Sequence, residues 1–446
     1  MDQSILKAYE AKCTQDAPPA CRSNCPLHVD VRQFAIHMQS GAWGKARVLL
    51  DKALPFAPLL TALCDHPCED ACVRSQLGGP VAIGDLERTC VAFSKEHAAR
   101  PAMLPAKNKR VAVLGSGIAG LAAAWELALK GFGVTLHFPG GNPEEHLLLE
   151  FRSVELAKGL DLGCLVRDAL NTLESMKVDF TVLEFSENIG AASAFKNDFD
   201  GVFVDAACFS ALAPGESAVD PMAGMHNGDR EACRGYASSA TMQAFEGKRG
   251  AGSLTRAMTG ASPSALREQE GPYASRLHAD ASGHERKDRI RPAQGLFTAG
   301  EAQEEASRCI SCECMRCVKE CAYLRQYGEY PKVYARQMFL NLGIYTGYRR
   351  LNSQINSCAL CGQCDEICPE RFSMADFCLL LREEMVRQRK MPPSAHHFAL
   401  QEFSASAYEA SVLALGGREE TSCSGVFFPG CQLAAARPAQ VRFVFR

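Results

Sequence analysis

Apolar and polar positions repeat with different periods along the chain, and these periods predict helices at both ends and strands in the middle. Across residues 31–54 the apolar side chains recur with helical spacing, interrupted by a glycine-containing break at 41–44, which predicts two helices. Short β-branched runs at 111–114 and 134–138 flank a segment rich in Ala and Leu, and this pattern predicts strand, helix and strand. Residues 162–185 predict a further helix followed by a strand.

The polar segments between these elements indicate linkers. Residues 101–109 contain Pro and Lys and precede the first predicted strand. Residues 261–300 are polar, charged and weakly periodic, which predicts an extended linker with solvated charges. An amphipathic helix is predicted where this linker ends, at 295–309, and another at 333–348 between two cysteine-rich runs.

A glycine-rich turn follows the first predicted strand. Gly115, Gly117 and Gly120 have the spacing G-x-G-x-x-G at the start of the predicted helix. In a dinucleotide-binding fold the first glycine allows the tight turn, the second lets a pyrophosphate approach the backbone, and the third lets helix pack on strand. The strands on both sides make a Rossmann-like fold the prediction, although His137 and Phe138 occupy the place of the acidic residue that usually holds the ribose.

The composition of the chain points to metal or redox chemistry. Its 446 residues suffice for several domains, and a net charge of −3 implies no strong attraction to nucleic acid or membrane. Of its 22 cysteines, fifteen lie in clusters, and the start MDQSILKAYEAKC has no apolar signal segment. Clustered cysteines without a secretory signal indicate metal sites, not disulfides, so we expect a cytoplasmic protein from a setting with little oxygen. No apolar run approaches the roughly 20 residues that cross a bilayer, so no membrane span is predicted.

The last cysteine run has the spacing of a ferredoxin half-motif. Cys358, Cys361, Cys364 and Cys368 form C-x2-C-x2-C-x3-C and are followed by Pro369. Three closely spaced thiolates reach three irons of one cubane, and the fourth points toward a second cubane. Zinc is the alternative, but zinc sites do not usually need a four-cysteine run that ends in C-P. Two such runs in tandem predict a ferredoxin with two [4Fe–4S] clusters.

The run before it holds five cysteines, one more than a cluster needs: Cys309, Cys312, Cys314, Cys317 and Cys321. Two interpretations fit. Either four of them form C-x2-C-x4-C-x3-C and Cys314 is surplus, or Cys314 replaces an upstream cysteine.

Six further cysteines lie near the N-terminus: Cys13, Cys21, Cys25, Cys64, Cys68 and Cys72. The stretches ACRSNCPLHVDVRQF, LCDHPCEDAC and PVAIGDLER resemble the N-terminal iron–sulfur domain of the glutamate synthase small subunit. The same domain occurs in dihydropyrimidine dehydrogenase and in the large subunit of the NADH-dependent ferredoxin:NADPH oxidoreductase. The resemblance implies a helical domain with up to two [4Fe–4S] clusters. The family's first motif is C-x2-C-x4-C-x3-C-P, and Asp16 stands at its second cysteine.

The resemblance also implies how these residues are shared between clusters. It assigns Cys13, Cys21 and Cys72 to one cluster, with Asp16 as the fourth ligand. It assigns Cys25, Cys64 and Cys68 to the other, with Glu87 where the family has Gln or Glu. Carboxylate oxygen is a harder ligand than thiolate. The alternatives are that Asp16 is a solvated loop residue beside a three-iron cluster, and that Glu87 is a helix-surface charge. Cys90 is expected to be a buried helical cysteine.

The glycine-rich segment resembles the flavin domain of the same family, which implies bound FAD. The stretch NDFDGVFVDAACF resembles the strand that closes the first half of that domain. Gly228 and Asp229 resemble its closing Gly-Asp, where the Asp contacts the ribityl–phosphate end of FAD; the alternative is an ordinary turn. Between these two stretches the family inserts an NADPH-binding domain of roughly 100 residues, whereas this chain has only about 20. The NADPH domain is therefore predicted to be missing.

The C-terminal part resembles a different redox family. Residues 372–403 are similar to the helical tail of the iron–sulfur subunits of heterodisulfide reductase and anaerobic glycerol-3-phosphate dehydrogenase. SGVFFPGCQ, which contains Cys431, resembles the start of their cysteine-rich domain, or is a coincidental P-G-C. The later cysteines of that domain do not follow, so Cys423 and Cys431 are expected to bind no cluster.

Together these patterns predict a multidomain protein of the α+β and α/β classes. The predicted parts are a helical iron–sulfur domain at 1–103, a Rossmann-like FAD domain at 108–260, a linker at 261–300, a dicluster ferredoxin domain at 301–395, and a tail at 396–446.

Three functions fit this organisation. The first is an electron-transfer subunit that passes electrons between FAD and several [4Fe–4S] clusters to a partner redox protein, which is heterodisulfide-reductase-like or a dehydrogenase, in a hetero-complex. The second is an NAD(P)H-dependent oxidoreductase like the glutamate synthase small subunit. The third is a degenerate scaffold without catalysis. No Ser-His-Asp or paired-carboxylate arrangement supports a hydrolase.

Overall fold

The structure is a computed structural model of the whole chain. The residues it describes are 3–98, 102–150, 161–183, 195, 197–205, 231–234, 239–293, 295–343, 350–391, 396–406, 430, 433 and 437–445. Gly228, Asp229, Cys423 and Cys431 lie outside these residues, so the predictions made for them are neither confirmed nor contradicted.

The chain divides into two compact units. The large unit comprises Thr14–Arg316, and the small unit comprises Met1–Cys13 with Cys317–Arg446. The predicted iron–sulfur and Rossmann-like domains therefore share one unit. The structure also differs from the predicted boundary at residue 301, because the residues up to Arg316 belong to the large unit.

Short helices with cysteine-bearing loops begin the large unit. They are α2 (Ala20–Asn24), α3 (Val31–Gln39), α4 (Trp43–Ala53), α5 (Ala57–Leu63), α6 (Pro67–Asp70), the 3₁₀ helix η1 (Val73–Leu77) and α7 (Ile83–Phe93). Asp30 caps α3 by accepting a hydrogen bond from the Gln33 amide at 3.2 Å. The chain leaves α3 through Gly41, whose φ of +67° suits glycine, so the predicted break between two helices is confirmed.

A five-stranded parallel sheet follows in the order β3-β2-β1-β4-β5. Its strands are β1 (Arg110–Leu114), β2 (Gly133–Pro139), β3 (Asp179–Leu183), β4 (Gly201–Asp205) and β5 (Glu231–Arg234). Its helices are α8 (Ile118–Leu129), α9 (Pro143–Glu150), α10 (Leu162–Ser175) and α11 (Ala240–Met258). Strand order reverses at β1, and the carboxyl ends of β1 and β4 meet there, which is where doubly wound sheets bind ligands.

Residues 261–297 do not form a free linker. They have little regular secondary structure, yet their main chain pairs with the N-terminal helices: the Tyr273 amide donates to the Ser23 carbonyl at 2.9 Å, and the Arg289 amide to the Gly78 carbonyl at 2.9 Å. Arg267 is buried, so not all of the charges are solvated as predicted. The segment is fixed in place because its backbone groups form hydrogen bonds with a distant part of the chain. Local periodicity cannot predict such bonds.

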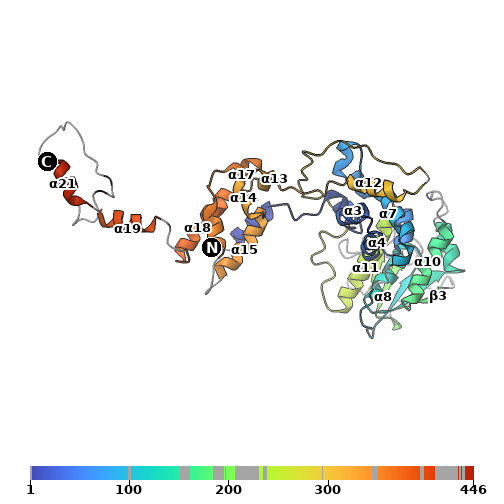
Figure 1. The fold of residues 1–446 in the computed structure, drawn as a ribbon. Coiled ribbons are helices and arrows are strands. Elements are labelled where there is room, and N and C mark those ends of the chain that lie inside the picture. Colours follow the sequence, from blue (N-terminus) through green and yellow to red (C-terminus); the bar gives the residue numbers. More distant parts are fainter. Residues whose placement is uncertain are drawn as a thin grey trace. The chain divides into compact units, whose positions relative to one another are not determined.

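Helix α12 (Ala299–Ser307) ends this segment and packs against α3 (Figure 1). Thr298 and Glu301 form a capping box at its start. The predicted amphipathic helix is therefore confirmed, and it belongs to the large unit.

The small unit is helical. It contains α1 (Gln3–Lys12), α14 (Ala322–Tyr327), α15 (Pro331–Gly343), α16 (Leu351–Ser357), α17 (Gln363–Ile367) and α18 (Met374–Arg387), and α13 (Arg316–Glu320) leads into it. Helix α1 packs on α15, and the Tyr9 ring contacts the rings of Phe372 and Phe377 at centroid distances of 5.5 and 5.0 Å. The helix predicted at 333–348 is confirmed up to Gly343. Farther along lie α19 (His397–Ser406) and α21 (Pro438–Phe445).

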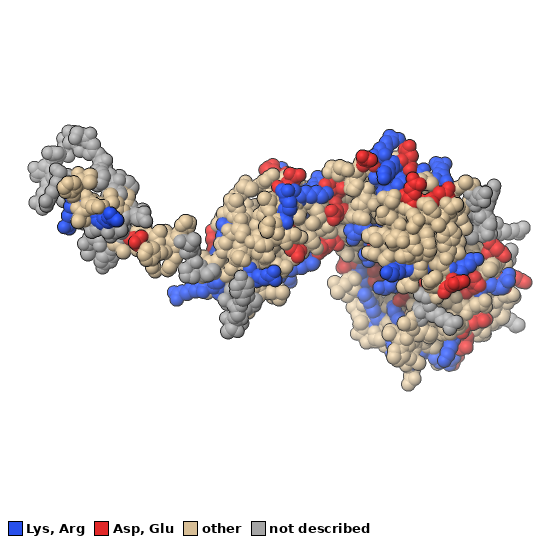
Figure 2. Space-filling view, in the orientation of Figure 1, with Lys and Arg blue, Asp and Glu red and all other residues tan. Residues whose placement is uncertain are grey.

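Charge and hydropathy add two facts about the described residues. None of their helices is both long and apolar enough to span a membrane. On the face drawn in Figure 2, Lys and Arg lie interspersed with Asp and Glu over the large unit, in keeping with the small net charge.

Candidate cofactor sites

The first candidate site unites three cysteines and a glutamate of the large unit. Cys25 follows α2, Cys64 follows α5, Cys68 lies in α6, and Glu87 lies in α7. His66, with φ of +54°, turns the chain between two of these cysteines, and its amide donates to the Cys64 sulfur at 3.3 Å. Glu87 is only 5% exposed, so the alternative that it is a surface charge is wrong.

The electrostatics indicate that these four groups lie close together. Burial raises the pKa of the Cys68 thiol, and neighbouring Glu87 and Cys25 raise it further. Burial also raises the pKa of the Cys64 thiol, again with contributions from Glu87 and Cys25. The Glu87 carboxyl has its pKa raised to about 8 by burial, which outweighs the opposing effect of Arg88. Three thiols and one carboxyl in an apolar setting match the donor set of an iron–sulfur cluster.

The second candidate site was not predicted in this form. Cys21, Cys72, Cys309 and Cys312 line one small cavity of about 30 Å³. Burial raises the pKa of the Cys21 thiol, and the thiols of Cys309 and Cys72 raise it further. Burial and then Cys309 raise the pKa of Cys312 to about 11. The resemblance had placed Cys13 and Asp16 with Cys21; Asp16 is exposed, and Cys13 belongs to the small unit.

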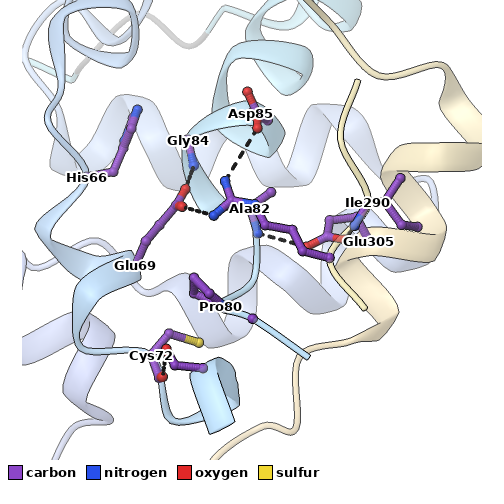
Figure 3. Close-up of polar contacts among 12 residues, drawn as sticks. His66, Glu69, Cys72, Pro80, Ala82, Gly84, Asp85, Ile290 and Glu305 are labelled. Atoms are coloured by element: carbon purple, nitrogen blue, oxygen red, sulfur yellow. Dashed lines mark hydrogen bonds and ion pairs between the residues drawn. The ribbon is translucent and has the colours of Figure 1, made fainter. Parts of the chain in front are cut away.

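A buried ion pair between Glu305 and Arg308 fixes the chain next to this cavity. Figure 3 shows Glu305 beside Ala82 and Ile290. The Glu305 carboxylate accepts hydrogen bonds from the amides of Ala82 and Ile290, each at 2.8 Å, and from the Arg308 guanidinium. Arg308 also donates to four carbonyls, those of Gly78, Gly79, Pro80 and Lys287. Both side chains are at most 2% exposed. Cys309 is the next residue, so this pair positions its thiol.

The third site lies in the small unit. Burial raises the pKa of the Cys364 thiol, and the thiols of Cys321 and Cys358 oppose its ionisation further. The Met374 amide donates to the Cys364 sulfur at 3.2 Å. Cys321 of one run thus lies with cysteines of the other run, the interleaving that a two-cluster ferredoxin needs. Cys361 is exposed.

Cys378 is a neighbour that the sequence did not reveal. It is fully buried in α18, and burial followed by the nearby Cys358 raises its pKa to about 12. Its position in the apolar run FCLLL predicts a buried cysteine in a helix. That pattern does not predict that the cysteine lies near Cys358. Cys90, in contrast, is buried in α7 as predicted.

None of the described cysteines forms a disulfide. Nor do three His, Cys, Asp or Glu side chains among the described residues converge closely enough for a single metal ion. A cubane keeps its thiolates farther apart than a single ion does.

The glycine turn has the backbone of a dinucleotide site. Gly115 has φ of +119°, and Gly117 is the N-cap of α8. A Cβ on Gly120 would lie 2.0 Å from the Gly115 carbonyl oxygen, so only glycine fits there. The turn therefore fits a pyrophosphate at the helix N-terminus.

Side chains near this turn and at the end of β2 fit FAD less well. The buried Asp205 carboxylate accepts a hydrogen bond from the Gly120 amide at 3.0 Å, which puts a negative charge at the helix end that would face phosphates. At the end of β2, His137 and Phe138 are both buried, so no acidic side chain is present there for a ribose. The backbone fits the cofactor, but these side chains do not help to hold it.

His137 should make the large unit sensitive to acid. Burial lowers its pKa, and its Nε2 has no hydrogen-bond partner within the described part of the chain. The folded state binds the proton more weakly than the unfolded state, so stability is complete above about pH 6.5 and falls as pH decreases toward the folded pKa. We expect His137→Leu to unfold at a temperature that exceeds the parent's by a margin that grows from pH 7 to pH 5. The exposed His397→Leu is the control; parallel profiles for His137→Leu and the parent would refute this role.

Comparison with known proteins agrees with the cysteine sites. Residues 2–99 match the model of dihydropyrimidine dehydrogenase domain II, 4Fe-4S cluster, and residues 308–373 match a 4Fe-4S dicluster domain. The chain carries two iron–sulfur domains. The first holds the N-terminal cysteines and Glu87, and the second begins one residue before Cys309.

Relatives of this iron–sulfur protein are oxidoreductase subunits. The NADPH-Fe(3+) oxidoreductase subunit beta of Geobacter sulfurreducens is 30% identical over 209 residues, 45% of this chain and 29% of the relative. The NADP(+)-dependent formate dehydrogenase subunit beta of Moorella thermoacetica is 25% identical over 211 residues, 41% and 29% of the two chains. The glutamate synthase [NADPH] small chain of Bacillus subtilis is 28% identical over 214 residues, 45% and 42%. The match spans less than half the length of each relative.

Proposed function

We propose that this iron–sulfur protein is an electron-transfer subunit of a larger oxidoreductase complex. The observation that carries the proposal is the adjacency of two cysteine groups in the large unit. Cys21 of one group and Cys25 of the other stand four residues apart across α2, about 6 Å along a helix axis. The thiols of Cys68 and Cys21 also interact electrostatically. Clusters bound there would be near neighbours, and such clusters supply one-electron transfer.

The protein's own residues would set the conditions for that transfer. The N–H groups that donate to Cys64 and Cys364 sulfurs stabilise negative charge on the ligands and favour the reduced state. The apolar surroundings exclude water from the buried thiols. In the small unit Cys361 is exposed and Leu360 beside it is 36% exposed, so this edge is where a partner redox protein would approach.

FAD at the glycine turn is part of the proposal, supported by the strand–turn–helix backbone and by the glutamate synthase relative. Flavin would supply the conversion between two-electron and one-electron transfer. Gly115, Gly117 and Gly120 would hold the pyrophosphate, while Asp205 would weaken binding. The names of the relatives favour a second candidate, an NAD(P)H-dependent oxidoreductase, which would need a nicotinamide site that the sequence does not predict.

An anaerobic absorption spectrum of the purified chain tests the proposal. We expect a flavin peak over a broad iron–sulfur shoulder, bleached by dithionite and unchanged by NADPH or NADH. Rapid bleaching by NADPH would favour the second candidate. A shoulder without a flavin peak would contradict the FAD assignment, and absence of the shoulder would overturn the electron-transfer function.

A further inference from the structure

Four cysteines from three distant parts of the sequence meet at the cavity described above. Cys21 lies in α2 and Cys72 follows α6, whereas Cys309 and Cys312 follow α12. The remaining lining is largely apolar: Ala20, Val31, Ala71, Val73, Val81, Ile83 and Ile310, together with Arg74. An enclosed set of four thiols with an apolar wall is a ligand arrangement that the sequence divides between two different motifs.

The chain is built to keep Cys309 and Cys312 at this cavity. The Glu305–Arg308 pair binds the two turns of chain around Pro80 and Lys287. The Arg32 guanidinium donates to the Cys312 carbonyl at 3.1 Å. The Cys314 amide donates to the Gln15 side-chain oxygen at 2.7 Å. These contacts all lie within the large unit, so the first half of the five-cysteine run is fixed to the N-terminal helices.

We propose that Cys21, Cys72, Cys309 and Cys312 bind one [4Fe–4S] cluster, in which the first half of the five-cysteine run supplies two of the four ligands. The inference rests on the proposed iron–sulfur function and deepens it. Each thiol gives up its proton as its sulfur bonds to one iron and displaces the ligand that this iron held on a carrier. Four iron–ligand bonds therefore form and four break, and no oxidation state changes. Cys309 and Cys312 take the places that the N-terminal motif gives to Cys13 and Asp16.

The charges around the cavity support a cluster with thiolate ligands, which is negative overall. Arg74 lines the cavity and is 4% exposed, and its Nε has no hydrogen-bond partner among the residues that the structure describes. Its Nη2 donates to the Glu285 carbonyl at 2.8 Å, which fixes the guanidinium in place. A buried cation beside four thiolates offsets their charge and favours the reduced cluster.

The proposal also divides the five-cysteine run. Cys309 and Cys312 serve the large unit, whereas Cys317 and Cys321 belong to the small unit, where Cys321 lies with Cys358 and Cys364.

Iron analysis of double variants tests the shared cluster. The full chain is purified anaerobically as Cys21→Ala, Cys309→Ala, Cys317→Ala and the pairwise combinations, with Cys90→Ala as a buried control. We expect Cys21→Ala, Cys309→Ala and their combination each to lose about four irons per chain, since all three remove the same cluster. Cys21→Ala combined with Cys317→Ala should lose about eight. Cys90→Ala should retain all iron.

The opposite pattern would overturn the proposal. If Cys309 served the ferredoxin, its loss would add to that of Cys21→Ala and would not add to that of Cys317→Ala. If an alanine variant fails to fold, the milder serine variants are used instead. Electron paramagnetic resonance then shows which reduced-cluster signal each serine variant alters. Cys21→Ser and Cys309→Ser should alter the same reduced-cluster signal, and Cys317→Ser a different one; a signal shared by Cys309→Ser and Cys317→Ser would refute the assignment. Parent protein without iron would defeat the proposed function itself. If the parent is loaded with iron but the losses of Cys21→Ala and Cys309→Ala add, only the shared cluster is defeated.

Discussion

Glu305→Ala is expected to lower the thermal unfolding midpoint of the large unit by on the order of 10 °C. The carboxylate is completely buried and accepts hydrogen bonds from two amides and from Arg308. Removing one partner of a buried, hydrogen-bonded ion pair leaves the other charge uncompensated, at a cost of about 3–5 kcal/mol. The amides of Ala82 and Ile290 would lose their partner in the same step.

The effect should extend to the cofactor. Arg308 holds the carbonyls of Gly78 and Lys287 together, and Cys309 follows it directly. When the guanidinium loses its carboxylate, it no longer holds these carbonyls firmly. The thiols that line the cavity then lose their fixed positions relative to one another. We therefore expect Glu305→Ala to lose iron as well as thermal stability.

Two variants make this test specific. Glu305→Gln keeps the shape and the acceptor oxygen but removes the charge, so it should lose less than alanine does. Glu304→Ala removes an exposed carboxylate from the same helix and should leave the midpoint unchanged within a degree or two, as roughly neutral surface changes do. Circular dichroism and iron content measure both outcomes. A Glu305→Ala protein as stable as Glu304→Ala would show that the pair does not fix this segment.

The sequence predicted what depends on neighbours along the chain. The break at Gly41, the strand–glycine–helix at 110–129 and the helix before Cys309 all follow from local spacing, and the structure has them. The interleaving of Cys321 with the last cysteine run also follows, because the ferredoxin spacing itself encodes which thiols meet.

The remaining features could not be predicted because their partners are far apart in sequence. The bond between Ala82 and Glu305 joins residues 223 positions apart. In the stretch EAQEEASRC, Glu305 and Arg308 look like ordinary helix-surface charges, since nothing local distinguishes a buried pair from a solvated one. The segment 261–297 has no periodicity because its main chain pairs with irregular carbonyls instead of forming helix or sheet. The cysteine cavity depends on all of these contacts.

Glu87→Ala is expected to change one cluster of the large unit. Glu87 lies buried beside the thiols of Cys25, Cys64 and Cys68, and we propose that its carboxylate is the oxygen ligand of that cluster, as the resemblance implies. Alanine leaves an iron without a protein ligand. We expect that iron to be lost, which would give the paramagnetic signal of an oxidised three-iron cluster and a fall of about one to four irons per chain.

The conservative substitution should behave differently. Glu87→Gln retains an oxygen donor of the same length, so the cluster should keep its iron. It removes one negative charge from the ligand set, which favours the reduced state, so the midpoint potential of this cluster should rise relative to the parent. Glu96→Ala removes an exposed carboxylate shortly after α7 and should change neither quantity.

The split between the two substitutions distinguishes a ligand from a packing residue. If Glu87 only filled space, Glu87→Ala and Glu87→Gln would both retain the iron. The midpoint potential of the cluster would then be the same in the two variants. If it binds iron, alanine removes the iron and glutamine shifts the potential of an intact cluster. The signals of the other clusters should stay constant in both variants, because the thiols on which Glu87 acts most strongly are those of its own group, Cys25, Cys64 and Cys68.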